Sequence, residues 1–116
     1  MTALYTAKPV LGAVETVTLF GAMESAEVDA RIDTGAKRTC VGRSLAESIG
    51  ILQPIDEAVF RSSKDDSDRR EIIHLTVVVK GQEHEIKASV TDRSNFSTQL
   101  RLGRDVLQDY LVDVEQ

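Results

Sequence analysis

The feature that most constrains the fold is a strict alternation of apolar and charged residues over positions 26–33. Four small or aliphatic residues alternate there with four charged ones, in the order Ala26, Glu27, Val28, Asp29, Ala30, Arg31, Ile32 and Asp33. Because the side chains of a β-strand point alternately to its two faces, this period of two predicts a half-buried strand. The strand should end at Asp33, where Thr34, Gly35 and Ala36 begin a loop.

Most of the remaining chain also predicts short strands. Apolar and β-branched stretches bounded by turn residues occur at residues 14–20, 58–60, 72–79, 85–91, 100–102 and 111–114. Lys80-Gly81 is a turn signal that predicts a hairpin between residues 72–79 and 85–91. The fold class is therefore mainly β, a small closed or sandwiched fold.

Helical signals are few. A first helix is expected to start at Ser44, whose hydroxyl would form a capping box with Glu47, and to end at Gly50. A second helix is expected over residues 104–110, where apolar residues recur at helical spacing. The architecture thus has one or two short helices.

The length of 116 residues predicts a single domain over residues 1–116. Aromatic residues make up only 4% of the chain, so aliphatic side chains must build the core. A chain of this size can form one core but leaves little material for a cleft between two lobes. A large active site would therefore need a second chain.

Charge and cysteine content narrow the function classes. The net charge of -5 argues against non-specific binding to nucleic acid. The single Cys40 cannot form an intrachain disulfide and fits a reducing compartment, so we expect a cytoplasmic protein. No stretch approaches the ~18 consecutive apolar residues of a membrane span, and residues 1–10 lack the apolar region of a signal peptide.

Two motifs could carry chemistry. The first is the loop that follows Asp33, although an Asp-Thr-Gly tripeptide alone also suits an ordinary Asx-type turn. The second lies roughly seventy residues downstream, where a short strand leads through Gly103 and Arg104 into the predicted helix at Val106-Leu107. A small β barrel can bring two such segments together.

Together the two motifs resemble the retropepsin-like aspartic proteases. The resemblance is closest to small cellular members that are labelled ATP-dependent zinc proteases and are associated with ATP-grasp peptide ligases. The matching stretches are residues 30–37, 62–63, 90–94, 102–104 and 111–113. The resemblance covers roughly residues 12–114, which implies that the core of the domain lies at about 12–114. This resemblance implies a small closed β barrel with one lobe per chain, Asp33 as the catalytic residue, and Thr34, Gly35 and Ala36 as its active-site loop.

One Asp-Thr-Gly per chain implies a homodimer. Two carboxyl groups held close together cannot both ionise, so one can act as a base towards water while the other, protonated, polarises the scissile carbonyl. Asp33 from each subunit would meet at a two-fold axis. The resemblance adds that Thr34 would bond across the two loops, that Gly35 would face the substrate backbone, and that the chain termini would build a shared sheet.

The resemblance also implies supporting residues around the loop. Arg104 would pair with an acid and brace the dimer, and Asp92 is the expected partner, with Arg93 and Gly103 as further structural support. The alternative for Asp92 and Arg104 is a surface ion pair that contributes little.

Several residues are candidates for substrate binding. Lys37 and Arg38 stand where retroviral members are acidic, so they could attract an acidic peptide such as a glutamate-rich tail made by a ligase. The alternative is that they are solvated loop charges. Ser62 and Ser63 fall in the polar stretch 61–70, which is expected to be an exposed loop and lies where a retropepsin flap would be; an ordinary mobile connection is the alternative.

No metal or cofactor is expected. His74 and His84 are the only histidines and do not form a zinc-binding motif, and the chain has no glycine-rich phosphate loop, so any dependence on ATP would belong to a partner. Cys40 as a nucleophile is a minor alternative. The competing functional hypothesis is a non-catalytic dimeric module that binds peptides on the same fold as the partner of an ATP-grasp ligase.

Overall fold

The computed structural model describes residues 8–51, 53–61 and 67–116. It contains nine strands and two helices within these residues. In chain order they are β1 (Val10–Leu11), β2 (Val14–Phe20), β3 (Ser25–Ile32), β4 (Cys40–Gly42), α1 (Arg43–Ser48), β5 (Asp56–Arg61), β6 (Ser67–Val79), β7 (Gln82–Thr91), β8 (Leu100–Leu102), α2 (Arg104–Leu107) and β9 (Leu111–Val112). The expected mainly β class with two short helices is confirmed.

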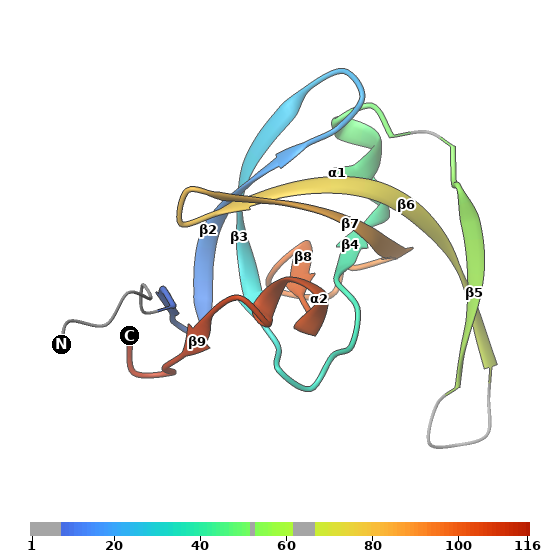
Figure 1. The fold of residues 1–116 in the computed structure, drawn as a ribbon. Helices are drawn as coiled ribbons and strands as arrows, with labels where there is room; N and C mark the ends of the chain where they lie inside the picture. Colours follow the sequence, from blue (N-terminus) through green and yellow to red (C-terminus); the bar gives the residue numbers. More distant parts are fainter. Residues whose placement is uncertain (1–7, 52, 62–66) are drawn as a thin grey trace, which may run out of the picture.

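Six strands form a closed barrel (Figure 1). They are hydrogen-bonded in the order β2-β3-β8-β4-β7-β6, and a second pairing between β6 and β2 closes the ring. β5 pairs only with the first half of β6 and projects with it from the barrel as an arm (Figure 1). β8 lies between β3 and β4, parallel to β3 and antiparallel to β4.

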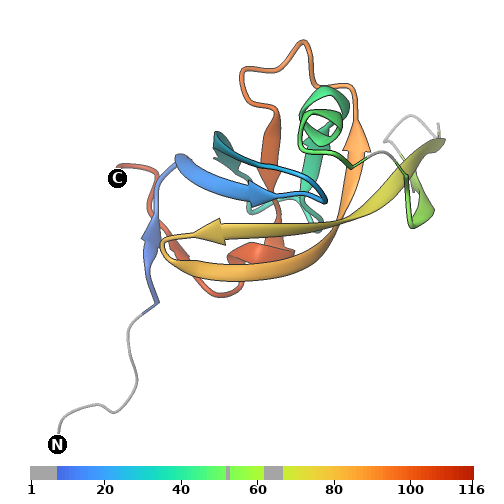
Figure 2. The same cartoon turned by 90° about the horizontal axis from the view of Figure 1, so that it is seen from above.

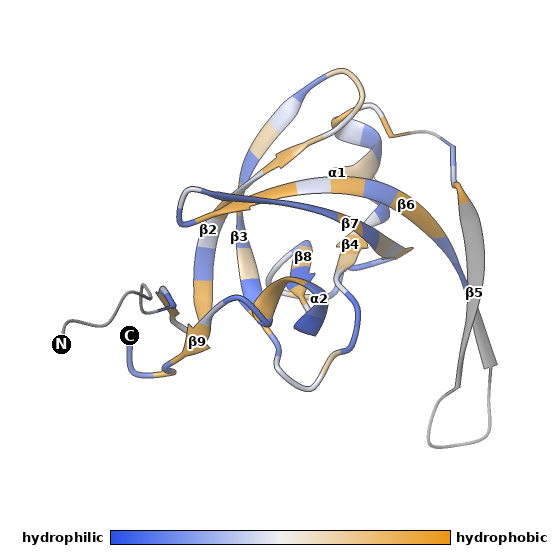
Figure 3. Ribbon diagram, viewed as in Figure 1, coloured by the Kyte–Doolittle hydropathy of each residue, from blue (hydrophilic) through white to orange (hydrophobic). Residues whose placement is uncertain are grey.

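The barrel interior is aliphatic. Fully buried side chains include Leu19, Val41 and Leu100, and burial of each such side chain contributes roughly 1.5–3 kcal/mol. Apolar and polar residues alternate over residues 73–77 of β6, as Figure 3 shows, because Ile73, Leu75 and Val77 point inward and pack on this core. Tyr110 is the one aromatic side chain among the buried residues of the described chain.

The hairpin and the alternating strand are confirmed. β6 and β7 pair antiparallel from Glu71 to Val79, and their turn residues Lys80 and Gly81 have φ values of 50° and 78°. Such positive values suit a two-residue hairpin turn, which explains the glycine. β3 covers the predicted alternation and ends one residue before Asp33.

Three local predictions are wrong. The first helix begins at Arg43 after Gly42, with no side-chain cap, so Ser44 lies inside the helix and forms no capping box. The second helix ends at Leu107 and not at residue 110. The polar stretch 61–70 is not one loop, since Arg61 pairs with Ser67 and β6 runs through residues 67–70. Ladder hydrogen bonds hold this arm in strand conformation although its composition is polar.

The two ends of the described chain lie together. β1 pairs parallel with β9 in a separate two-stranded sheet, on the same side of the barrel as the C-terminus (Figures 1 and 2). The expected closing strand at 111–114 is thus shortened to Leu111–Val112, and β1 was not predicted. Neither α1 nor α2 has the length and apolar character needed to span a membrane, and the described residues contain no other helix.

Candidate active site

Asp33 lies where β3 ends and is fixed by hydrogen bonds to both of its neighbouring segments. Its backbone N–H donates to the carbonyl of Leu102 in β8 at 3.0 Å, and its carbonyl accepts from the N–H of Ala36 at 3.2 Å. The carboxylate Oδ1 accepts from the backbone N–H of Gly35 at 2.9 Å. One carboxylate oxygen is therefore committed to the loop, and Oδ2 is left for other contacts.

Gly35 is favoured by close packing and not by backbone conformation. Its φ is not positive, but a Cβ at this position would lie 3.2 Å from Asp33 Oδ1. That distance is tighter than ordinary van der Waals contact. Glycine thus lets the backbone N–H approach the carboxylate closely.

The second carboxylate oxygen of Asp33 faces an arginine that the sequence analysis missed. Arg101 Nε lies 3.8 Å from Asp33 Oδ2, and the two side chains are 28% and 36% exposed. Arg101 is the central residue of β8, and its neighbours Leu100 and Leu102 are fully buried. The alternation Leu-Arg-Leu was the available signal, because it puts Arg101 on the face opposite the core.

Gly103 and Arg104 lie against the loop that follows Asp33. The Arg104 backbone N–H donates to the Ala36 carbonyl at 2.8 Å, and Arg104 Nη1 donates to the Thr34 carbonyl at 2.9 Å. A Cβ on Gly103 would lie only 2.6 Å from the backbone of Arg38. The two motifs that the sequence analysis linked are thus in direct contact.

The acid that braces this region is Asp105, and it acts through Thr39. Thr39 is fully buried, and its Oγ1 donates to Asp105 Oδ1 at 2.7 Å while its backbone N–H donates to Asp105 Oδ2 at 2.9 Å. The Gly103 N–H donates to the same Thr39 Oγ1 at 3.1 Å. Neither Thr39 nor Asp105 was predicted.

Asp92 does not form the expected ion pair with Arg104. Its Oδ1 accepts from the Ser94 backbone N–H at 2.9 Å, and this bond together with the Ser94 hydroxyl lowers the pKa of Asp92. The contact is local because Asp92 starts a turn of its own. Arg104 instead contacts the active-site loop directly.

Arg93 supports the segment between β7 and β8. It is 3% exposed, its Nε donates to the Thr98 carbonyl at 3.0 Å, and its guanidinium lies 4.4 Å from the ring centre of Phe96. Gln99 Nε2 donates to the Arg93 carbonyl at 2.7 Å. These contacts give Arg93 a structural place in its own loop.

The candidate substrate-binding residues are only partly placed. Lys37 is exposed and Arg38 is half-buried, and neither forms an ion pair with another described residue. Ser62 and Ser63 lie outside the described residues.

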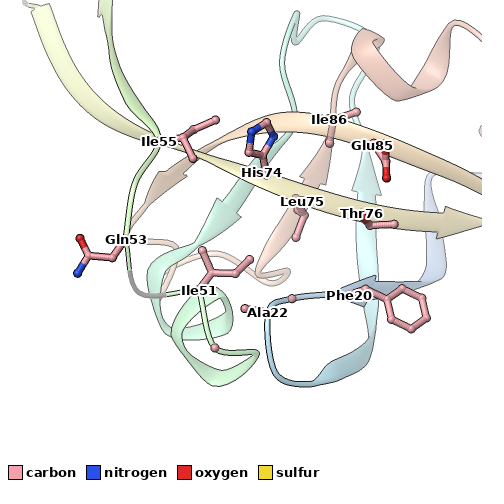
Figure 4. A pocket seen from close by; sticks show the side chains of 12 residues that line it. Phe20, Ala22, Ile51, Gln53, Ile55, His74, Leu75, Thr76, Glu85 and Ile86 are labelled. Atoms are coloured by element: carbon pink, nitrogen blue, oxygen red, sulfur yellow. The ribbon is translucent and has the colours of Figure 1, made fainter.

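A groove of about 600 Å³ lies on another part of the barrel, away from Asp33 (Figure 4). Apolar side chains such as Phe20, Ile51 and Ile86 line it, together with His74 and Glu85. Asp33 is not among the lining residues, and its side chain is 36% exposed, so the candidate site lies outside this groove, on the surface of the barrel.

The described histidines and Cys40 do not suit a metal centre or a nucleophile. His84 Nε2 lies 2.7 Å from the Tyr110 hydroxyl, whereas His74 lines the groove. No three His, Cys, Asp or Glu side chains of the described residues gather closely enough to hold a metal ion. The described residues therefore do not fit the zinc for which the resembling ATP-dependent zinc proteases are labelled. Cys40 is fully buried, which denies its thiol access to a substrate.

Solved structures share this architecture. A protein of unknown function (DUF785) from Legionella pneumophila has a TM-score of 0.62 at 20% identity, over 93% of this chain and 94% of that one. Simian foamy virus protease gives 0.60 at 18% identity over 82% and 91%, and EIAV protease in complex with the inhibitor HBY-793 gives 0.58 at 18% over 94% and 93%. No protein-family model and no curated protein matches the sequence. The chain therefore has the retropepsin-like fold, while identities this low say nothing of activity.

Proposed function

We propose that the chain is one half of a homodimeric aspartic peptidase, in which Asp33 of each subunit activates water for the hydrolysis of a peptide bond. The observation that carries this proposal is the placement of Asp33 at the end of β3. Its Oδ1 is held by Gly35, its Oδ2 accepts no hydrogen bond from the described residues and lies 3.8 Å from Arg101 Nε, and its loop is braced by Arg104. Activation of water requires a carboxylate with a fixed orientation and one oxygen that can accept a proton.

The need for two copies follows from the chemistry and the open face. One chain contributes a single Asp33 to this face, outside the groove of the barrel. A second Asp33 across a two-fold axis would supply the protonated partner, and the second barrel would supply the missing wall of a cleft. The two-stranded sheet of β1 and β9 joins the two ends of the described chain, where the resemblance leads us to expect the shared sheet.

The proposed reaction divides the work between the two carboxyl groups. The ionised Asp33 takes a proton from water as the water oxygen attacks the peptide carbonyl carbon. The protonated Asp33 of the other subunit donates a hydrogen bond to the carbonyl oxygen as negative charge develops there. The Asp33 that took the proton from water passes it to the leaving amine as the C–N bond breaks, so one carboxyl group is again ionised and the other protonated.

An acidic peptide, including one extended by an ATP-grasp ligase, is the proposed substrate class. Lys37 and Arg38 follow the active-site loop directly and have no anionic partner among the described residues. Cations next to a catalytic carboxylate would favour the approach of an anionic chain.

A non-catalytic peptide-binding module is the second candidate. The hydrogen bond from the Gly35 N–H to Asp33 Oδ1 is an Asx-type contact, which can hold a loop without any catalytic role. In that case Asp33 would be needed only for the shape of the loop.

Replacing Asp33 by Asn separates the two candidates. Asparagine keeps an oxygen that can accept from Gly35, so the loop should stay folded, but it cannot exchange a proton with water. We expect the cleavage of a peptide library to fall by about 10²–10⁴-fold or below detection. Asp29→Asn, in the same strand, is the matched control and should keep full activity. Equal cleavage by the Asp33 variant would exclude the peptidase, and no cleavage by either protein would favour the module.

A further inference from the structure

Two arginines flank Asp33 on the same face of the sheet. Arg31 and Arg101 are direct partners in the parallel register of β3 and β8, so their side chains lie side by side on the same face. Arg31 is two residues before Asp33 in the same strand direction, which also points it to this face. The carboxylate of Asp33 thus borders a pair of guanidinium groups.

The burial of the neighbouring side chains shows that this is the outer face of the barrel. Ala30, Leu100 and Leu102 are fully buried, and the residues between them in each strand must point away from the barrel interior. Arg31 is exposed and the side chain of Arg101 is 28% exposed.

The positive charge of the pair is only partly balanced within the described part of the chain, because one carboxylate, Asp33, faces two guanidinium groups. Arg31 forms no ion pair there, and the contact of Arg101 is with Asp33 alone, at 3.8 Å. Arg101 Nε is buried and has no hydrogen-bond partner among the described residues. Like charges directly opposite in a sheet repel, and a buried donor without a partner is costly. An added anion beside the exposed part of the two guanidinium groups would remove this repulsion.

We propose that Arg31 and Arg101 form a carboxylate-binding subsite, which holds the acidic side chain of the substrate residue that adjoins the scissile bond. Guanidinium groups bind carboxylates through paired, charge-assisted hydrogen bonds, and two adjacent groups can enclose one carboxylate. Because the subsite lies beside Asp33, it would select the side chain of the substrate residue next to the scissile bond. The assignment of a scissile bond rests on the proposed peptidase function, whereas the subsite itself rests on the register and the unpaired charges.

The carboxylate could come from a glutamate or aspartate side chain or from the end of a peptide. The test uses two acetylated and amidated octapeptides that differ only in having Glu or Gln at the residue that adjoins the scissile bond. A third peptide has Gln there and a free C-terminal carboxylate. The kcat/KM ratio of the Glu to the Gln peptide is measured for wild type, Arg31→Leu, Arg101→Leu and the control Lys87→Leu. Lys87 pairs with His74 in β6 and β7, and His74 lines the separate groove.

We expect the wild-type ratio to exceed roughly 10 and to approach 1 in each arginine variant, because a charge-assisted contact is lost. Lys87→Leu should keep the wild-type ratio although it removes the same charge. Arg101→Lys, which keeps the charge but not the paired donors, should give an intermediate ratio and guards against a folding defect. A ratio near 1 in wild type, or one that survives both arginine changes, would overturn the subsite while leaving the peptidase proposal intact.

Binding provides a readout that does not need catalysis. Fluorescence anisotropy of the same peptides, labelled and mixed with the Asp33→Asn protein, should show a preference for Glu that is lost when Arg101→Leu is added. This preference in a protein whose wild type cleaves no peptide would support the subsite and overturn the peptidase. A preference seen only for the free C-terminus would support the subsite with the chain end as its anion, and equal binding of all three peptides would overturn it.

Discussion

At the scale of single residues, the loop around Asp33 depends on a fully buried threonine. Thr39 Oγ1 joins Asp105 Oδ1, at 2.7 Å, to the Gly103 N–H, at 3.1 Å, and so connects the segment after the loop to the start of α2. Valine has nearly the same shape but would remove both hydrogen bonds. It would leave the Gly103 N–H buried without this acceptor and weaken the hold on Asp105.

We therefore predict that Thr39→Val lowers the free energy of unfolding by about 2–3 kcal/mol, measured by urea denaturation. Thr16→Val is the matched control, because Thr16 Oγ1 also donates to an aspartate, Asp29, at 3.0 Å, but is exposed. Its cost should be about 0.5 kcal/mol or less. Equal costs for the two variants would show that the buried position gives Thr39 no special role.

The candidate site was only partly predictable from the sequence, because local patterns mark some of its residues and not others. Asp33 follows a regular alternation, and Gly103 and Arg104 belong to a motif with a recognisable spacing, so local sequence was sufficient to find them. The contact of Arg101 with Asp33 depends on β8 lying beside β3, and the bond of Thr39 to Asp105 joins residues 66 positions apart. Such contacts are set by strand register, which no local pattern contains.

At the scale of elements, the predicted strands are those that a local pattern marks, and the missed strands are those that depend on pairing with another segment. The β6–β7 hairpin combines an apolar period of two with a Lys-Gly turn, and both signals agree. The arm of β5 and β6 carries polar residues where it leaves the barrel, so composition predicted a loop although ladder pairing makes it a hairpin. β1 is two residues long and exists through its pairing with β9, which is distant in sequence.

Tyr110 ties the end of the α2 segment to this hairpin. Its hydroxyl donates to the Val79 carbonyl at 2.9 Å and lies 2.7 Å from His84 Nε2. The residue is 5% exposed, and burial, followed by the nearby charge of Asp109, raises the pKa of Tyr110. The folded state therefore favours the neutral phenol more than the unfolded state does.

We predict that Tyr110→Phe costs about 1 kcal/mol at pH 8, where the tyrosine is neutral in both states. As the pH rises above the ordinary value of 10, the unfolded tyrosine ionises first and the wild type loses stability that the phenylalanine variant keeps. Urea denaturation from pH 8 to 11 should show the difference between the two proteins shrinking above pH 10. A constant difference would mean that Tyr110 ionises equally easily in both states.

At the scale of the whole molecule, the fold places one catalytic candidate on an open face and leaves apolar side chains exposed near the joined ends. Leu111 in β9 is 54% exposed although its neighbour across the two-stranded sheet, Val10, is half-buried. An exposed leucine alone is ordinary. Its place beside the expected shared sheet makes it the residue at which a second copy is best tested.

We predict that Leu111→Asp weakens the proposed dimer at least about tenfold, because a charge would be buried in the contact without a partner. Sedimentation velocity over a range of protein concentrations measures this change. Met23→Asp is the control, since Met23 is 82% exposed at the β2–β3 turn, at the opposite end of β2 from β1. If each active site needs two copies of Asp33, the peptidase activity of the Leu111 variant should fall at low concentration and recover at high concentration. Activity that is lost equally at all concentrations would place Leu111 in the folding of one chain and not in the contact between two.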